Sequence, residues 1–239
     1  MISKIKNTLF SIVLWPIWYA YLITILPIFL IYIIFVNKKY FHYFLRPMSY
    51  FFCLFGGQRL RVSGEIPDPK FGPYLYLMNH ESLFDHFAIG WHIKHYVTAI
   101  AKFEQFKYPL WGHVAKYYGI EPIDRSNTKK AIRSLKKVEK EIIENKVSFL
   151  IAPEGTRSKD GSLGEFKKGA FHLAKKTGAS IVPVIINGAY EAKNIKDWRL
   201  NPGTIDVYFS DNISEDIYKN MSVEELRDYV REIIKEFVD

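Results

Sequence analysis

Cysteine is nearly absent from the 239-residue chain, and the single Cys53 has no partner with which to form an internal disulfide. The sequence therefore gives no indication of an oxidising compartment. Acidic residues are fewer than basic ones, 25 against 33, and the formal net charge is +8. This basic balance leaves nucleic acid, anionic lipid headgroups and phosphorylated substrates as candidate partners.

Charged residues are also absent between Lys6 and Lys38, and the core of this stretch, residues 9–36, is almost continuously apolar. As a helix it would extend about 42 Å, longer than the hydrocarbon core of a bilayer, which is about 30 Å thick. Pro16 and Pro27 permit an alternative of two shorter arms within one leaflet, because each removes a backbone hydrogen bond. The run is too long for the apolar part of a cleaved signal peptide.

A second, aromatic-rich run, 40–55, follows and ends at Gly56-Gly57. We predict that residues 1–55 form hydrophobic membrane-anchoring helices and that residues 56–239 form the catalytic domain. Basic residues are more numerous after the apolar stretch than before it. This excess favours a cell-membrane location with the catalytic domain on the cytoplasmic side.

From Gln58 onward, short apolar runs alternate with helical patterns. The expected strands are 59–62, 74–78, 97–101, 120–123, 147–151, 181–186 and 204–209, and the clearest helices are 83–93, 128–145 and the segment after 221. This alternation predicts an α/β fold with a largely parallel central sheet covered by helices, and with ligands at the carboxyl ends of the strands. Pro183 favours an edge or loop-facing position for its strand.

Several catalytic signatures are missing. His80-Glu81 begins like a zinc-protease helix, but the position of the second histidine holds Phe84. The G-x-S-x-G nucleophile elbow and the phosphate-binding P-loop are absent as well. His92 and His95 are three residues apart without an acidic or cysteine partner at motif spacing, so we expect no metal site.

His80 and Asp85 are the strongest candidates for chemistry. Five residues apart, they cannot share one face of a continuous helix. If 74–78 is a strand and 83–93 a helix, His80 lies in the turn and Asp85 in the first helical turn, from which a carboxylate can reach the imidazole. A carboxylate that holds one ring nitrogen as N–H leaves the other free to act as a general base. Taken alone, the pair is also compatible with a capping histidine at a helix start.

Two arginines follow later strands. Arg125 comes after 120–123, and Arg157 comes after 147–151 within the turn Pro153–Ser158. Both should emerge at the same end of the sheet as His80. A planar guanidinium binds a phosphate monoester through two hydrogen bonds, so the set indicates a phosphorylated substrate, although each arginine alone is also typical of a surface ion pair.

Four blocks in this order resemble the signature of the glycerolipid acyltransferases, most closely that of bacterial 1-acyl-sn-glycerol-3-phosphate (lysophosphatidic acid) acyltransferases. The blocks are Asn79-His80 with Asp85, Ile123-Asp124-Arg125, Pro153-Glu154-Gly155-Thr156-Arg157-Ser158 and Val182-Pro183-Val184. The similarity covers residues 55–210 and implies a glycerol-3-phosphate acyltransferase-like fold.

The resemblance implies transfer of an acyl chain from acyl-CoA or acyl-ACP to the sn-2 hydroxyl of 1-acyl-glycerol-3-phosphate, without a cofactor. In it, His80 is the base and Asp85 its orienting partner. The residues that the resemblance assigns to substrate binding are Lys102, Arg125, Glu154, Gly155, Thr156 and Arg157. Expected partners are the lysophospholipid acceptor, the thioester carrier and the bilayer.

Two departures and several alternatives remain. Many relatives have glutamine where this chain has Glu81, which we interpret as facing solvent, and we interpret the additional His86 as structural. The acceptor could instead be another lysophospholipid or a lyso-aminolipid, or the chain could be a non-catalytic membrane lipid-binding protein. Nucleic acid is disfavoured as a partner, because the aromatics concentrate in the uncharged N-terminal region instead of interleaving with lysines.

Overall fold

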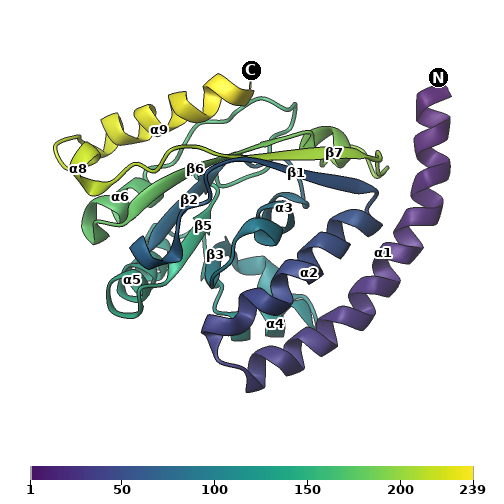
Figure 1. Ribbon diagram of the computed structural model, residues 1–239, viewed down its shortest axis with the longest axis horizontal. Coiled ribbons are helices and arrows are strands. Elements are labelled where there is room, and N and C mark those ends of the chain that lie inside the picture. Colours follow the sequence, from purple (N-terminus) through teal and green to yellow (C-terminus); the bar gives the residue numbers. More distant parts are fainter. Residues whose placement is uncertain (1, 239) are drawn as a thin grey trace.

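The computed structural model describes residues 2–238, and within them seven strands form one sheet in the order β1-β7-β6-β2-β5-β3-β4 (Figure 1). The strands are β1 (Gln58–Gly64), β2 (Tyr74–Met78), β3 (Val97–Lys102), β4 (Glu121–Ile123), β5 (Ser148–Ile151), β6 (Ser180–Asn187) and β7 (Gly203–Phe209). Neighbouring strands are parallel except for β6 and β7, which are antiparallel. The predicted α/β class with a largely parallel sheet is confirmed.

Helices cover both faces of this sheet (Figure 1). They are α1 (Ile2–Phe35), α2 (Phe41–Phe55), α3 (Asp85–His92), α4 (Trp111–Tyr118), α5 (Thr128–Asn145), α6 (Gly169–Thr177), α7 (Ala189–Ala192), α8 (Glu215–Tyr218) and α9 (Val223–Val238). Short 3-10 turns span Lys38–Tyr40, Pro69–Phe71 and Phe103–Lys107. The apolar stripes of α5, α6 and α9 pack on one face, and α2 and α3 pack on the other.

The central strand β2 is buried along its whole length, as expected for a parallel strand between two helical layers. Alternate side chains enter opposite layers: Tyr74, Tyr76 and Met78 face the layer of α2 and α3, whereas Leu75 and Leu77 face the opposite layer. Because β2 is held on both sides, by β5 and β6, its carboxyl end is a rigid platform for the residues that follow.

The position predicted for Pro183 was wrong. Its strand β6 lies in the interior of the sheet, between β2 and β7. Pro183 is opposite Leu77, and the antiparallel ladder with β7 begins only at the next residue, Val184. Proline has no amide hydrogen, and at this position, just before the ladder, none is needed for pairing with β7. The carbonyl of Pro183 still accepts a hydrogen bond from the Ser210 amide at 3.0 Å.

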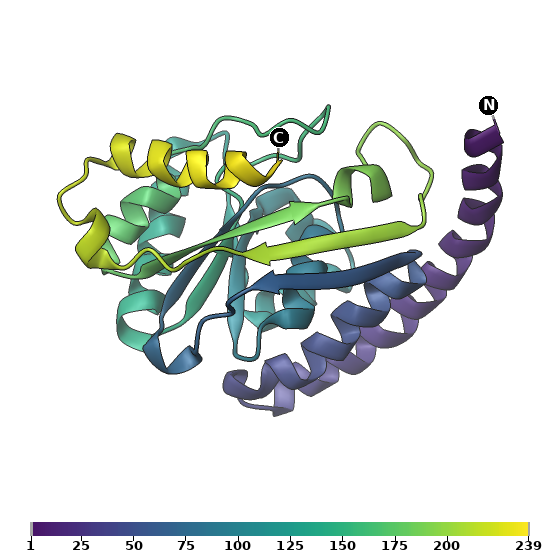
Figure 2. The same cartoon turned by 45° about the horizontal axis from the view of Figure 1, so that its top comes forward.

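Helix α1 runs without a break through Pro16 and Pro27, both of which are exposed, so the alternative of two arms divided at these prolines was wrong. Instead, α1 and α2 lie side by side in antiparallel directions (Figure 2). The indole nitrogen of Trp18 donates to the carbonyl of Phe52 at 3.2 Å, which ties the two helices together.

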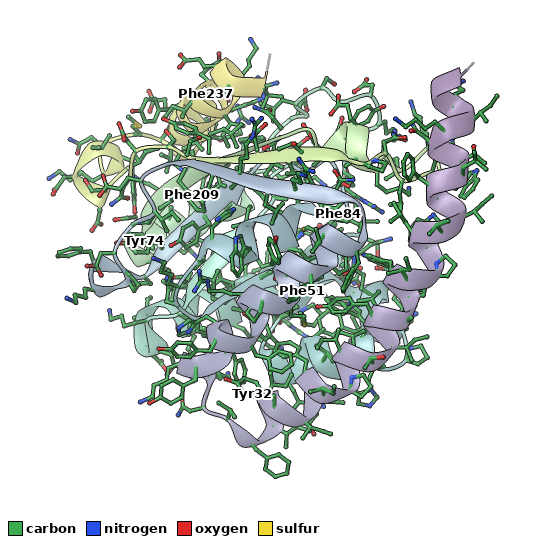
Figure 3. All side chains as sticks on the ribbon, turned by 45° about the vertical axis from the view of Figure 1, so that its right-hand side comes forward. Tyr32, Phe51, Tyr74, Phe84, Phe209 and Phe237 are labelled. Carbon is green, nitrogen blue, oxygen red and sulfur yellow. The ribbon has the colours of Figure 1, made fainter. Side chains whose placement is uncertain are left out.

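Only one side of α1 is covered. Its inner stripe reaches the loop before β7, where the Leu200 amide donates to the Ser11 hydroxyl at 2.9 Å, and includes the buried Trp18 and Phe29. The outer side carries large exposed side chains along the helix (Figure 3), namely Ile5, Leu9, Phe10, Ile12, Val13, Ile17, Tyr19, Ile23, Ile28, Ile31, Ile34 and Phe35. This outer side of α1 is an apolar surface with no covering element among the described residues.

The predicted boundary at residue 55 coincides with the end of α2, but packing continues across it. Phe52 and Cys53 belong to the same buried cluster as Tyr76 and Phe84. The rings of Phe52 and Phe84, which lie edge to face at a centroid distance of 5.8 Å, join α2 to the chain just before α3. Helices α1 and α2 thus contribute one wall of the core that supports the carboxyl end of β2.

Candidate active site

The residues after β2 form a tight turn that brings His80 onto Asp85. Asp85 is the first residue of α3 and is fully buried. Its Oδ2 lies 2.7 Å from Nδ1 of His80 and also accepts the amide protons of Glu81 at 2.7 Å and Ser82 at 2.9 Å. Because this carboxylate oxygen can only accept, Nδ1 carries the hydrogen, and Nε2 of the neutral ring is free to take a proton. The contact expected from sequence is present.

A second turn, after β5, supports the backbone of His80. The Glu154 carboxylate accepts the His80 amide at 2.7 Å and the Gly164 amide at 2.8 Å. The carbonyl of His80 accepts the Ser158 amide at 2.7 Å. Glu154 is only 6% exposed, so its carboxylate holds the two turns together and is poorly placed to contact a substrate. Gly155 has φ of +75°, a left-handed conformation that favours glycine at this turn.

Glu81 does not face solvent, and our interpretation of it was wrong. It is 5% exposed, and its two oxygens accept from the Asn79 side chain at 3.0 Å and from the Tyr190 amide, at the start of α7, at 3.1 Å. Burial, reinforced by the nearby Asp85 carboxylate, raises the pKa of Glu81 to about 8. Hydrogen bonds from Tyr190 and Asn79 oppose the rise, and Glu191 adds to it.

This raised pKa predicts a pH-dependent stability. A carboxyl that ionises at about 4.3 when unfolded and near 8 when folded binds more protons in the folded state, so folding loses stability as pH rises between these values. Glu81→Gln does not titrate, so we expect its unfolding midpoint, taken relative to that of the wild type, to rise by about 10 °C between pH 5 and pH 9. Thermal unfolding in detergent micelles at both pH values measures this.

The exposed Glu65 supplies the matched control for that substitution. Glu65→Gln removes the same charge from the chain without removing a buried carboxyl, and its unfolding profile should follow the wild type at every pH. A Glu81→Gln profile parallel to the wild type from pH 5 to pH 9 would contradict the assignment.

His86 is adjacent to the pair, with its ring edge to face against His80 at a centroid distance of 5.4 Å. Burial and the nearby His80 lower the pKa of His86 to about 4, so this ring is neutral near pH 7. It packs against one side of the His80 ring, which is consistent with the structural role expected for it.

The candidate substrate-binding residues divide into two groups. Gly155, Thr156 and Arg157 lie on the turn after β5, next to the strand that carries His80. Lys102 ends β3, and Arg125 follows β4 at the edge of the sheet. With neighbouring strands about 4.8 Å apart, the ends of β3 and β4 are roughly 10 Å and 14 Å from that of β2. The sheet therefore brings Arg157 close to His80 and leaves Lys102 and Arg125 farther away.

The cationic groups also differ in their partners. Lys102 lies 3.4 Å from the Glu104 carboxylate and is about half exposed. Among residues 2–238, no carboxylate lies within salt-bridge distance of Arg125 or Arg157. The two arginines thus retain their full capacity to bind an anion.

Within the described part of the chain, no cluster of three or more His, Cys, Asp or Glu side chains is arranged to hold a metal ion. His92 and His95 are neutral, partly or fully buried side chains outside any such cluster. Burial lowers the pKa of both to about 4, and neither Nε2 has a hydrogen-bond partner in residues 2–238.

Sequence reasoning named Asn79 within the His80 block without giving it a role, and it passed over Ser82; both residues fix the turn. The Asn79 side chain donates to the carbonyl of Ile186 and accepts from its amide, both at 2.8 Å, so it bridges β2 and β6. The Ser82 hydroxyl donates to the carbonyl of Lys193 at 2.8 Å. These partners lie over a hundred positions away in the chain. The only signal in the sequence was the adjacency of Asn79 and Ser82 to the His80 motif.

Fold and site together define an α/β enzyme with a histidine–aspartate pair at the carboxyl edge of a largely parallel sheet, beside an arginine that has no carboxylate partner within residues 2–238. A family model described as Acyltransferase matches residues 59–187. The chain belongs to this acyltransferase family.

Relatives and a solved structure agree with that assignment. The chain is 38% identical over 165 residues to the 1-acyl-sn-glycerol-3-phosphate acyltransferase of Cocos nucifera, covering 69% of this chain and 53% of that protein. It is 27% identical to the enzyme of that name from Haemophilus influenzae, covering 76% and 75%. The crystal structure of the 1-acyl-sn-glycerophosphate (LPA) acyltransferase PlsC from Thermotoga maritima superimposes with a TM-score of 0.84 at 27% identity, over 99% of this chain and 96% of that chain. The chain spans about half the length of the plant relatives.

Proposed function

We propose that this protein transfers an acyl chain from an acyl thioester to the sn-2 hydroxyl of 1-acyl-glycerol-3-phosphate and so forms phosphatidic acid. The observation that carries the proposal is the 2.7 Å contact of His80 with the buried Asp85, beside an arginine that has no carboxylate partner among residues 2–238. The relatives and the structural neighbour that carry the name of this activity support it.

In the proposed reaction, Nε2 of His80 removes the proton of the acceptor hydroxyl as its oxygen attacks the thioester carbonyl carbon. The C–S bond then breaks, and the thiolate leaves with the proton that the imidazolium returns. Asp85 holds the Nδ1 hydrogen throughout and stabilises the positive charge that the ring carries between these steps. No acyl-enzyme and no cofactor is required.

Arg157 is the proposed primary ligand of the acceptor phosphate, because its turn is hydrogen-bonded to the His80 carbonyl through Ser158. Gly155 and Thr156 shape that turn, and Glu154 anchors it. Lys102 and Arg125 are proposed to act at greater range, on the acceptor or on the negatively charged thioester carrier. Both acyl-CoA and acyl-ACP fit this role.

The direct test is acyl transfer by detergent-purified protein, with each thioester carrier, to lysophosphatidic acid and to lysophosphatidylcholine. We expect transfer to the phosphate monoester alone. Arg157→Met should raise the KM for lysophosphatidic acid about tenfold or more, because it removes a charge-assisted contact. The exposed Arg133 on α5 supplies the control, and Arg133→Met should behave as wild type. Preferential transfer to lysophosphatidylcholine or a lyso-aminolipid would show that the proposed acceptor is wrong. Transfer to none of these lipids would favour a lipid-binding role.

We further propose that α1 lies within one leaflet instead of crossing the bilayer. Residues 4–35 are long and apolar enough to span a membrane. Two features support the in-plane arrangement. Along residues 11–29, the inner stripe of α1 packs on the rest of the domain, and the opposite side of residues 7–35 carries no charged side chain. The basic Lys38 and Lys39 just after α1 favour the cytoplasmic leaflet.

A charge on the outer side of α1 should release the protein from lipid. Ile23 is 70% exposed, and replacing a side chain buried in lipid with a charged one costs about 2 kcal/mol or more. We expect Ile23→Lys to weaken flotation with anionic vesicles at least tenfold. Ile132→Lys, at an exposed isoleucine on the lysine-rich α5, should leave flotation unchanged. Cysteines introduced at Lys4 and Lys38 that label from opposite sides of a vesicle would contradict the in-plane arrangement.

A further inference from the structure

A hollow of about 660 Å³ lies between α1 and the loop that leads from α7 to β7. Trp15 and Tyr19 of α1 line one side, with their rings stacked at a centroid distance of 5.4 Å. Lys193 and residues 195–198 line the other side. The Trp15 indole donates to the carbonyl of Trp198 at 3.0 Å, which fixes the loop against the helix, and Figures 1 and 2 show the two segments side by side.

The chemistry of this hollow is divided between apolar and cationic surfaces. Trp15, Tyr19, Ile195 and Trp198 provide apolar walls, whereas Lys193 and Lys196 provide positive charge. The hollow also includes one carboxylate, that of Asp197, but both of its oxygens accept from the Arg199 guanidinium at distances of 2.6 to 3.0 Å. The carboxylate is therefore largely neutralised, and the two ammonium groups remain able to bind an anion.

Lys193 connects the hollow to the active site. Its carbonyl accepts the Ser82 hydroxyl at 2.8 Å, and Ser82 in turn donates its amide to Asp85. Burial and the nearby Arg157 guanidinium lower the pKa of Lys193, whereas the Asp197 carboxylate opposes this shift. Like charges at close range are unfavourable until an anion lies between them.

We propose that this hollow is the entry site for the acceptor lipid: a lysolipid with a phosphate monoester enters from the bilayer along α1, binds Lys193 and Lys196, and passes its phosphate to Arg157. This inference rests on the proposed function. It identifies Lys193 as a residue that determines specificity for the acceptor, and it gives the path of the acceptor lipid to the active site. The acyl chain lies against the aromatic walls, and the phosphate lies on the lysines.

The position of the hollow favours the acceptor lipid over the thioester carrier. Its wall is formed by α1, whose exposed Ile12 and Ile23 are the proposed lipid contacts. A lysolipid can therefore move laterally from the leaflet into the hollow without its chain crossing water, which costs about 0.8 kcal/mol per methylene exposed. The carrier part of the thioester donor is water-soluble and gains nothing from such a wall, since only its acyl chain is apolar.

The test uses full-length protein in detergent micelles and two probes, 1-oleoyl-glycerol-3-phosphate and the uncharged 1-oleoyl-glycerol. We expect Lys193→Met to raise the dissociation constant for the phosphate probe at least fivefold, and Lys193→Met with Lys196→Met at least tenfold. Binding of the uncharged probe should change less than twofold. Lys136→Met, on the exposed side of α5, removes the same charge and should change neither.

Steady-state kinetics separate the acceptor from the donor. The Lys193→Met protein should show a raised KM for the acceptor, an unchanged KM for the thioester and an unfolding midpoint within about 2 °C of wild type. A shift confined to the thioester KM, or binding equal to that of Lys136→Met, overturns the inference while leaving the proposed function in place. Wild-type protein that binds the phosphate probe but transfers no acyl chain refutes the proposed function alone. Wild-type protein that does not bind the probe overturns the inference.

Discussion

Replacement of His80 by alanine is expected to lower kcat by about 10³-fold, because the group proposed to take the acceptor proton is lost. The fold should survive this change. The hydrogen bonds of residue 80 with Glu154 and Ser158 involve its backbone amide and carbonyl, which alanine retains. Its side chain is 18% exposed and lies at the sheet edge. We expect the unfolding midpoint to change by about 2 °C or less.

Acyl transfer at saturating lysophosphatidic acid, with and without the substitution, measures this effect. His172 on α6 is exposed, and its side chain makes no hydrogen bond within residues 2–238, so His172→Ala is the matched control and should retain full activity. A folded His80→Ala protein that keeps a tenth or more of the wild-type rate would show that another group accepts the proton.

The fold could be predicted well wherever periodicity alone decides it. The strand at 74–78 and the helix at 128–145 were predicted at the observed bounds, since continuous burial and a 3.6-residue stripe leave few alternatives. The helix expected from residue 83 begins instead at Asp85. The Asp85 carboxylate holds the amides of Glu81 and Ser82 in a turn, and that side-chain contact delays the helix.

Long-range pairing was the part that sequence could not supply. Pro183 lies in the interior of the sheet because β7, a later strand of the chain, pairs with β6 on its outer side. The sequence around Pro183 contains no sign of this pairing. Hydropathy indicated a membrane helix at 9–36, yet the packing of its inner stripe depends on Leu200, which lies 189 positions from Ser11.

The candidate site shows the same division. The His80–Asp85 contact could be predicted, because both residues lie within one local turn. The burial of Glu81 could not be predicted, because its second hydrogen-bond partner, the Tyr190 amide at the start of α7, is 109 positions away in the sequence. Lys193 escaped notice because its relation to Arg157 arises only when the loop after α7 folds over the turn after β2.

Asp85→Asn is the second substitution with a large expected effect, since it keeps the shape of the side chain and removes the charge. Oδ2 of Asp85 accepts from three donors, whereas Oδ1 is buried and has no partner among residues 2–238. If the asparagine oxygen takes the place of Oδ2, the new NH₂ group points into a site without an acceptor, which costs about 1–3 kcal/mol. If the amide is reversed, its NH₂ meets two backbone N–H groups and forces the His80 ring to accept at Nδ1, so that Nε2 is protonated and cannot act as a base.

Both orientations impair the reaction, because even the first lacks the negative charge that stabilises the imidazolium. We therefore expect kcat to fall by about 10²-fold or more and the unfolding midpoint to fall by several degrees. The half-exposed Asp206, whose Oδ1 lies 2.6 Å from Nε of Arg61, provides the control, since Asp206→Asn removes an equal charge and should leave kcat unchanged. If Asp85→Asn loses stability but keeps the wild-type kcat, Asp85 serves the turn alone. A loss of kcat at unchanged KM for lysophosphatidic acid identifies the carboxylate as the group that holds His80 ready for the proton, since a merely distorted turn would also move Arg157 and raise that KM.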